Sequence, residues 1–398
     1  MTVSQQMMQE RQIGGTRPRV MFVSHTGQMA GAELVLLDVV KPWAGATAFL
    51  FEDGPLHSAL AQSGLVVQTS RWGRGLTSVQ RDRSLAKAIP LGGRLAALVA
   101  ELARAARRHD VIYANSQKAF VLSAVATALA RRPLVWHLHD IITSAHFGRG
   151  QRRLQVTLAN ARASRVIVPS KAAAEAFVAE GGRASLVEVV ANGLDIAPDA
   201  TPRADLRRRL DLPQGPLVGV FSRLAAWKGQ HVVLHAVAAT PGVNAVIAGD
   251  ALFGEQAYAA QLRQLADQLG IADRVRFLGH RSDVTTLMRA VDVMIHPSVD
   301  PEPFGRTLVE AMLAGTPVIA TDTGAASDIL DGGKAGTLIP PGDAPALAAA
   351  IAHVLADPDA IAAQCDHARQ RARTHYDTAT MQTAINAAIA AAARGDAP

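Results

Sequence analysis

The chain has 398 residues, 49% of them hydrophobic and 19% charged, with 40 Lys and Arg against 34 Asp and Glu for a formal net charge of +6. This length predicts two domains or three, and the high apolar content excludes an intrinsically disordered chain. The single cysteine, Cys365, excludes an internal disulfide, argues against a cysteine-rich zinc module and indicates a reducing compartment.

Residues 1–17 are polar and predict a flexible leader without the apolar core of a signal peptide. Over residues 18–195, short apolar runs alternate with longer Ala-rich segments of helical periodicity. Strands are predicted at Val20–Ser24, Thr47–Phe51, Leu65–Thr69, Val111–Ala114, Leu134–Leu138, Val166–Pro169 and Val187–Val190, and helices at Gly31–Trp43, Leu91–Arg108, Lys118–Ala130 and Lys171–Glu180. This alternation is typical of a parallel sheet buried on both faces and predicts a Rossmann-like domain.

The pattern is interrupted over residues 196–216, where several prolines and an arginine run predict a linker with one short helix. It resumes over residues 217–375. Strands are predicted at Leu217–Phe221, Ala245–Ala248, Val275–Leu278, Val293–His296, Val318–Ala320 and Gly336–Ile339, and helices at Gln230–Ala238, Ala257–Leu269, Phe304–Ala314, Ala344–Leu355 and Ala360–His375. Residues 376–398 are expected to form a C-terminal helix, at about Thr378–Ala392.

Two such arrays predict an α/β fold of two doubly wound domains that face each other across a cleft, with ligands at the carboxyl ends of the strands. No apolar run reaches the about 18 residues of a spanning helix, so we expect a cytoplasmic protein. Residues 1–195 carry a net charge of +10 and residues 196–398 one of −4. This asymmetry indicates either different partners for the two halves or an uneven spread of solvated arginines.

The segment from Asp300 to Glu310, DPEPFGRTLVE, follows a predicted strand and enters a helix near Phe304. The backbone N–H groups and the positive dipole end of a helix start suit a phosphate. Glu302 lies in the loop and Glu310 about two turns into the helix, so one carboxylate can reach the reacting part of a ligand and the other a pair of hydroxyls. Taken alone, the pattern favours a helix-capping Glu302 and a solvated Glu310.

A second segment follows the first strand of the second array, where Arg223 and Lys228 flank a turn. A guanidinium can bind phosphate oxygens in a fork and an ammonium adds a mobile point charge, so the pair fits a diphosphate. Two solvated loop cations are the alternative. The anion-ready helix start in the same half of the chain argues against it.

Together, Arg223…Lys228-Gly229 and Glu302-Pro-Phe-Gly…Glu310 resemble the signature of glycosyltransferase family 4, retaining enzymes with the GT-B fold of two Rossmann-like domains. Further matches lie at residues 246–250, 275–280 and 314–321. The resemblance is dense over residues 217–343 and diffuse over residues 20–195, and it specifies neither the sugar nor the acceptor. One departure is Ser222, which stands where the family usually has glycine.

The resemblance implies that Arg223 and Lys228 hold the donor diphosphate and act in catalysis. Glu302 would contact the transferred sugar near the reaction centre, and Glu310 would bind the nucleotide ribose. Other implied donor-binding positions are His280 and Arg281 beside the base, the backbone amides of Phe304 and Gly305, and Gly31. The loop that ends at Gly31 looks like a Gly-Gly-Ala-Glu loop of the family, and a plain strand–helix turn is the alternative there.

The predicted strand from Leu134 ends at His137 and His139, followed by Asp140. Alternation puts both imidazoles on one side of the strand, where a histidine beside an aspartate can bond a sugar hydroxyl or take part in proton transfer. By position, His139 resembles the catalytic histidine of the family's first domain, whereas a structural role is favoured for His137. Metal ligation by the pair is disfavoured because no third ligand is evident.

We expect no required metal and no cofactor beyond the nucleotide sugar as co-substrate. The Asp357-Pro-Asp359 element lies between two predicted helices, where Asp and Pro act as helix stop and start signals. Two arginine-rich segments, Arg71–Arg83 and Phe147–Arg153, suit an anionic membrane or a phosphorylated carrier lipid, with solvated loops as the alternative. Nucleic acid is not expected as a partner because no recognition motif accompanies the scattered basic residues.

The sequence therefore predicts a retaining glycosyltransferase whose second domain binds a nucleotide-diphosphate sugar and whose first domain binds a glycan, lipid-linked or small-molecule acceptor. Synthesis of cell-surface polysaccharide or glycolipid is the expected setting, with peripheral contact to the inner face of a membrane left open. Two alternatives remain. A non-catalytic nucleotide-sugar binder would need neither Glu302 nor His139, and a sugar-nucleotide epimerase of the same fold would need no acceptor.

Overall fold

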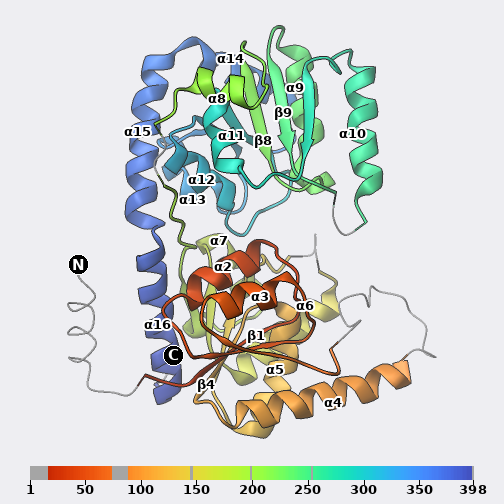
Figure 1. The fold of residues 1–398 in the computed structure, drawn as a ribbon, viewed down its shortest axis with the longest axis vertical. Coiled ribbons are helices and arrows are strands. Elements are labelled where there is room, and N and C mark those ends of the chain that lie inside the picture. The colour runs from red at the N-terminus through yellow and green to blue at the C-terminus, as the bar shows by residue number, and fades with distance from the viewer. Residues whose placement is uncertain (1–16, 74–87, 144–146, 198–199, 252–253, 397–398) are drawn as a thin grey trace.

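The computed structural model describes residues 17–73, 88–143, 147–197, 200–251 and 254–396. The predicted leader therefore lies almost wholly outside the described residues. Two sheets, each with helices on both faces, follow one another along the long axis of the molecule (Figure 1). All strand pairings in the described part of the chain are parallel. This is the predicted doubly wound architecture.

The first sheet has seven strands in the order β3-β2-β1-β4-β5-β6-β7. Its strands are β1 (Val20–Ser24), β2 (Thr47–Leu50), β3 (Val66–Thr69), β4 (Val111–Ala114), β5 (Leu134–His137), β6 (Ala163–Val168) and β7 (Val187–Val189). The helices between them are α2 (Gly31–Val40), α3 (Pro55–Gln62), α4 (Ala88–Ala106), α5 (Gln117–Ala130), α6 (Arg149–Arg162), α7 (Lys171–Ala179) and η2 (Ala184–Leu186). Every residue of β1, β4 and β5 is buried, as expected for strands covered on both faces.

Apolar helix faces cover both sides of this sheet. On one side Leu98 of α4, Phe120 of α5 and Phe177 of α7 pack with Trp136 of β5, and the Phe120 and Trp136 rings stack with centroids 4.0 Å apart. The other side is covered by α2, α3 and the last helix of the chain, α16 (Thr378–Arg394). Although it follows the second domain in sequence, α16 therefore packs against the first (Figure 1).

The second sheet has six strands in the order β10-β9-β8-β11-β12-β13. They are β8 (Leu217–Phe221), β9 (Asn244–Ala248), β10 (Val275–Gly279), β11 (Val293–His296), β12 (Val318–Thr321) and β13 (Thr337–Ile339). The helices are α9 (Gln230–Ala239), α10 (Gln256–Gln268), α11 (Val284–Ala290), α12 (Arg306–Ala314), α13 (Ala326–Ile329), α14 (Ala344–Ala356) and α15 (Pro358–His375), with short turns η3 (Ala226–Lys228) and η4 (Asp331–Gly333). Helices α9, α10 and α14 cover one face, and α11, α12, α13 and α15 the other.

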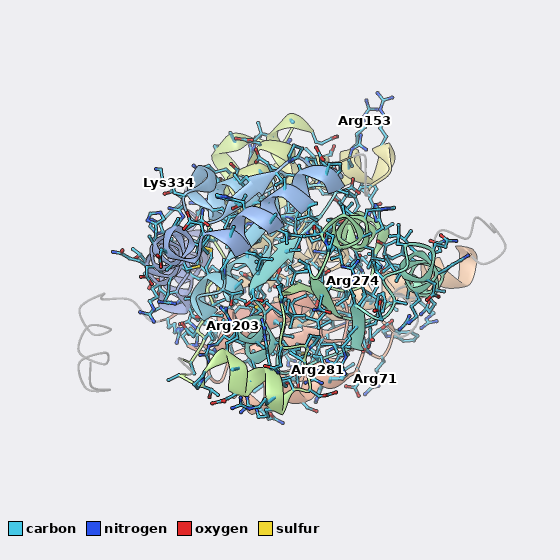
Figure 2. All side chains as sticks on the ribbon, turned by 90° about the horizontal axis from the view of Figure 1, so that it is seen from above. Arg71, Arg153, Arg203, Arg274, Arg281 and Lys334 are labelled. Atoms are coloured by element: carbon cyan, nitrogen blue, oxygen red, sulfur yellow. The ribbon has the colours of Figure 1, made fainter. Side chains whose placement is uncertain are left out.

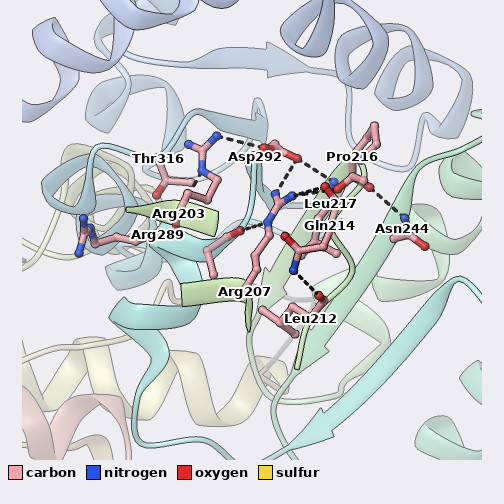
Figure 3. A network of polar contacts seen from close by, with 12 residues as sticks. Arg203, Arg207, Leu212, Gln214, Pro216, Leu217, Asn244, Arg289, Asp292 and Thr316 are labelled. Carbon is pink, nitrogen blue, oxygen red and sulfur yellow. Dashed lines mark hydrogen bonds and ion pairs between the residues drawn. The ribbon is translucent and has the colours of Figure 1, made fainter. Parts of the chain in front are cut away.

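The predicted linker contains one short helix, α8 (Arg203–Arg209), which is fastened to the second domain (Figure 3). The Arg207 guanidinium is buried, donates from Nε to the carbonyl of Ala290 at 2.7 Å and lies 2.8 Å from Asp292 Oδ2. The same carboxylate oxygen accepts the backbone N–H of Leu217 at 2.9 Å. Because Leu217 begins β8 and Asp292 directly precedes β11, this network fixes the starts of two neighbouring strands.

Two stretches of chain connect the domains, one after β7 and one between α15 and α16, and they touch each other. The backbone N–H of Leu194 donates to the carbonyl of Tyr376 at 2.7 Å. A Cβ atom on Gly193 would lie 2.5 Å from Thr378 Cα, so the two connections approach too closely for any side chain at position 193. The two interdomain connections thus lie side by side, as the two strands of a hinge between domains do.

Every predicted strand is present in the structure, with ends shifted by at most a few residues. The alternative of a solvated loop at Phe147–Arg153 holds only in part, because α6 begins at Arg149 and buries Val156 and Ala159 on one face. The predicted capping role of Asp357 is confirmed, since its Oδ1 accepts the N–H of Ala360 at the start of α15. No single helix among the described residues is long and apolar enough to cross a membrane, and only α14 together with the helices after it meets that test, as a bent pair.

Candidate active site

Lys228 and Glu302 lie in loops at the carboxyl ends of the neighbouring strands β8 and β11. Lys228 ends η3 and is only 8% exposed, and its ammonium is paired with the Glu302 carboxylate. The loops are locked together because the N–H of Val299 donates to the carbonyl of Trp227 at 2.8 Å. Gly229, at φ +72°, allows this approach, since a Cβ there would lie 1.9 Å from a carbonyl oxygen of the other loop.

Two further side chains hold Glu302. His296 Nε2 lies 2.6 Å from Glu302 Oε2, and the Ser298 hydroxyl donates to the same oxygen at 3.0 Å. Burial alone would raise the pKa of Glu302, but the Lys228 ammonium and His296 outweigh it and hold the pKa well below its usual range. Glu302 is therefore an ionised carboxylate in a fixed position, not a group that exchanges protons near neutral pH.

The backbone of Glu302 is held by a glycine in the loop after β12. The N–H of Ala325 donates to the Glu302 carbonyl at 3.0 Å. Gly324 has φ +60°, and a Cβ on it would lie 2.3 Å from the Glu302 carbonyl oxygen. Only glycine tolerates both the conformation and the contact, so position 324 helps to set where the carboxylate lies.

Arg223 lies on the same loop as Lys228, and both cations flank Trp227. The Arg223 guanidinium carbon is 5.5 Å and the Lys228 ammonium 4.3 Å from the indole centroid. The Gln230 amide donates to the carbonyl of Arg223 at 2.8 Å and to the Ser222 hydroxyl at 2.9 Å, which fixes the loop. Two cations on one ordered loop at a strand end can bind a diphosphate.

Glu310 lies on α12, as predicted, but this helix begins later than expected. Gly305, at φ +77°, is the residue before the first helical turn, and the helix starts at Arg306 rather than near Phe304. The Phe304 ring is buried in the core against Tyr376, which draws the chain inward before the helix can begin. The prediction of the helix start was therefore wrong by two residues, and any contact of Phe304 and Gly305 with a ligand would use their backbone.

Arg306 lies one turn before Glu310 on α12. Its Nε donates to Glu310 Oε1 at 3.1 Å. Burial raises the pKa of Glu310 above its usual value, and the Arg306 charge partly offsets this effect. In this structure, the carboxylate that is predicted to bind ribose hydroxyls thus accepts a hydrogen bond from an arginine.

His280 and Arg281 follow β10, two strands away from β8 in the same sheet and at the same edge. His280 is exposed. Arg281 forms a two-point ion pair with Asp283, with Nε and Nη2 at 2.8 and 2.6 Å from its oxygens. The structure therefore places this loop at the carboxyl-end edge of the second sheet, as predicted. The Arg281 guanidinium is paired with Asp283 there.

In the first domain, His139 follows β5 and its Nε2 is hydrogen-bonded to Asn115 Oδ1 at 3.0 Å. The His137 and His139 rings lie 3.9 Å apart, so they do share one side of the strand. His137 is fully buried and bonded to the Tyr113 hydroxyl, in agreement with a structural role. Burial lowers the pKa of His139 to about 3, so its imidazole is neutral near pH 7 and can bond a hydroxyl without carrying charge.

Gly31 is the first residue of α2. A Cβ there would meet no atom of the described residues within 4 Å, so neither a tight turn nor packing within that part of the protein requires glycine at this position. By contrast, a Cβ at Gly27 of the same loop would lie 2.3 Å from the backbone of Asp53. The loop therefore needs Gly27 to fold and leaves Gly31 open to a ligand.

The two arginine-rich segments do not form one surface. Arg71 and Arg153 lie at opposite margins of the molecule in Figure 2. Residues 74–83 of the first segment lie outside the described residues. In the second segment Arg152 is paired with Glu180 at 2.8 Å.

Among the described residues no group of three or more His, Cys, Asp or Glu side chains could hold a metal ion.

Comparison with known proteins agrees with this geometry. The family model described as glycosyl transferases group 1 matches residues 202–375, and the model described as glycosyltransferase family 4 matches residues 59–198. HepE of Anabaena, solved in complex with UDP and glucose, is 40% identical with a TM-score of 0.85 over 94% of this chain and 99% of that one. The chain belongs to glycosyltransferase family 4. The two facing sheets are accordingly the predicted GT-B fold.

Curated relatives match part of the chain. D-inositol 3-phosphate glycosyltransferase of Mycobacterium marinum is 38% identical over 42% of this chain and 36% of its own length. The lipopolysaccharide core mannosyltransferase LpsB of Rhizobium meliloti is 32% identical over 53% of this chain and 63% of its own length. The chain thus spans about a third to two thirds of these relatives.

The sequence predictions missed the residues that support the site. His296 and Ser298 hold Glu302, Asn115 holds His139, and Arg306 holds Glu310. His296 and Asn115 end or directly follow buried strands, which is the available signal for a polar side chain at a ligand-binding edge. Arg306 could have been found from its spacing to Glu310, since residues four apart on a helix are neighbours.

Proposed function

We propose that this family 4 glycosyltransferase moves a sugar, with retention of configuration, from a UDP-sugar to the hydroxyl of a glycan or lipid-linked acceptor. The observation that carries the proposal is the buried Lys228–Glu302 pair at the strand ends, beside Arg223. The complexes of HepE with UDP and with UDP-glucose, at about 40% identity over nearly the whole chain, support uridine as the base. Synthesis of a cell-surface glycan is supported by the likeness to LpsB.

The reaction depends mainly on protein groups that stabilise negative charge, and it needs no side chain that transfers a proton. The bond between the anomeric carbon and the phosphate oxygen breaks, the acceptor oxygen bonds that carbon, and its proton passes to the departing phosphate on the same face. Lys228 has three donors, so it can keep one on Glu302 and direct others to the phosphate. Because the negative charge of the leaving diphosphate grows in the transition state, this ammonium and Arg223 stabilise the transition state more than the ground state.

Glu302, His139 and Glu310 would position the donor. An ionised carboxylate such as Glu302 accepts hydroxyl hydrogen bonds from the transferred sugar. A neutral His139 can bond the same sugar or the acceptor from the first domain.

The nucleotide would be held by a second group of residues. Glu310 would accept hydrogen bonds from the two ribose hydroxyls, and the amides of Phe304, Gly305 and the first turn of α2 at Gly31 would approach the phosphates. His280 and Arg281 would border the base.

A nucleotide panel tests the donor. UDP-glucose is expected to raise the melting temperature of the wild-type protein, and GDP- and ADP-sugars to raise it less, because specific binding to the native state stabilises it by about 2.7 kcal/mol at 100 times the Kd. Glu310→Gln should lose most of the shift. Release of UDP should then depend on an added glycan or lipid-linked acceptor. Acceptor-independent release of free sugar would favour an epimerase, and no shift with any nucleotide would refute the proposal.

Gly31→Ala separates folding from donor contact. An alanine at this first helical position should raise the free energy of unfolding by about 0.4–1 kcal/mol, since it restricts the unfolded chain and meets no atom in the fold. The same methyl group would occupy the space proposed for a phosphate, so turnover should fall. Gly93→Ala on α4 is the control, since a Cβ at position 93 also meets no atom of the described part of the chain, and it should stabilise without loss of turnover. Unchanged turnover in Gly31→Ala would contradict the phosphate contact.

A further inference from the structure

Arg306 stands between the two domains. On its own helix, its Nε donates to Glu310 Oε1 at 3.1 Å. Across the interface, its Nη1 lies 3.7 Å from Oδ2 of Asp38, on α2 of the first domain. That Nη1 is buried and has no hydrogen-bond partner among the residues that the structure describes. The guanidinium is therefore satisfied on the side of Glu310 and unsatisfied on the side of Asp38.

Asp38 is arranged to complete this contact. Its Oδ1 is paired with Lys41 at 2.8 Å, which leaves Oδ2 toward Arg306. The backbone of Asp38 is held by α16, because the Gln382 amide donates to its carbonyl at 2.7 Å. A buried N–H without a partner costs about 1–3 kcal/mol. A shortening of the 3.7 Å gap by less than about 1 Å would bring the pair within hydrogen-bond distance.

The same two helices carry the proposed donor contacts. Helix α2 begins at Gly31 and carries Asp38 two turns later, whereas α12 begins at Arg306 and carries Glu310 one turn later. Figure 1 shows α2 on the side of the first domain that faces α12 and α13. A translation of α2 as a rigid helix that brings its start toward a bound diphosphate would also bring Asp38 toward Arg306.

We propose that Arg306 is a positioning residue that couples nucleotide binding at Glu310 to the approach of the two domains through Asp38. This inference rests on the proposed function. In this structure Arg306 bonds Glu310. When ribose hydroxyls donate to Glu310 they compete for its oxygens, and the guanidinium shifts its hydrogen bonding to Asp38, which stabilises the closed arrangement. Nucleotide binding and closure then favour each other, as linkage requires.

A second ion pair across the interface provides a matched control. Lys171, the first residue of α7, lies 3.7 Å from Asp328 on α13. It joins the same two domains at the same distance, but both side chains are more exposed, and neither contacts Glu310. If any interdomain charge pair aided closure, the two pairs would behave alike. If Arg306 transmits the state of Glu310, only the Asp38 pair responds to nucleotide.

The test is a double-mutant cycle on UDP affinity, measured by calorimetric titration of the full chain. Asp38→Asn should weaken UDP binding about 5-fold or more, and it should have no further effect in an Arg306→Gln background. Asp328→Asn should change the affinity by the same small factor in both backgrounds. Small-angle scattering adds a readout that a merely structural role would not move, since UDP should reduce the radius of gyration of wild type and of Asp328→Asn more than that of Asp38→Asn.

The outcomes separate the two proposals. Equal UDP affinity and equal compaction in wild type and Asp38→Asn would overturn the coupling and leave the donor assignment standing. An Asp38→Asn effect that persists unchanged in the Arg306→Gln background would also overturn it, because Arg306 would not be the link. Failure of wild type to bind UDP, GDP or ADP would overturn both proposals. Circular dichroism spectra of all variants check that each is folded.

Discussion

Lys228→Met is expected to lower kcat by a factor of about 10²–10³, the loss typical of removing one preorganised group that stabilises developing negative charge. The methionine keeps most of the length of the side chain and its apolar packing beside Trp227 while it removes the ammonium. The measurement is steady-state release of nucleotide with the donor found in the panel and a glycan or lipid-linked acceptor. The change in kcat should exceed the change in KM, because the charge on the leaving diphosphate develops after binding.

The single variant also leaves Glu302 buried without its cation, which costs up to the about 3–5 kcal/mol of a broken buried pair. A second variant separates the two effects. Lys228→Met combined with Glu302→Gln removes both charges, so stability toward urea should recover most of the loss while kcat stays low. Lys171→Met, an exposed cation on the first domain, should change neither. Recovery of turnover together with stability in the double variant would contradict a direct role of Lys228 in the reaction.

The fold was predictable because its signals are local. Runs such as Val20–Val23 and Leu217–Phe221 are apolar throughout, and this marks strands buried on both faces. The place where Lys228 and Glu302 meet was predictable for a related reason, since parallel strands bring their carboxyl ends to one edge of the sheet. Adjacency of β8 and β11 then put the two loops in contact, although the residues are 74 positions apart in the chain.

What could not be predicted depends on contacts between distant segments. Helix α16 continues the periodic pattern of α15, and nothing in its sequence says that it packs against the first sheet rather than the second. The late start of α12 follows from burial of Phe304 against Tyr376, a tertiary contact that overrides a favourable helical pattern. The Arg306–Asp38 pair depends on how the two domains are placed relative to each other. The sequence of neither domain alone determines that placement.

The interior of the second domain provides the other large expected effect. Arg207→Met should lower the free energy of unfolding by about 3–5 kcal/mol in urea denaturation, because it leaves Asp292 without its buried cation. It also removes the donors to three backbone carbonyls, those of Ala290, Gln214 and Gly215. Arg203→Met is the matched control. It lies on the same helix and pairs with the same carboxylate at 3.0 Å, but its side chain is 45% exposed, so the loss should be no more than about 1 kcal/mol.

The position of this network explains why its loss should act on stability rather than on the reaction. Asp292 bonds the first residue of β8 and directly precedes β11, so the network ties together the beginnings of the two strands whose far ends carry Lys228 and Glu302. The Lys228–Glu302 contact has its own supports at that far end, in Gly229, His296 and Gly324. Below its lowered melting temperature, Arg207→Met should therefore turn over at a rate close to that of wild type. A loss of kcat as large as that of Lys228→Met at a temperature where the variant is fully folded would instead mean that the alignment of β8 and β11 sets the catalytic geometry.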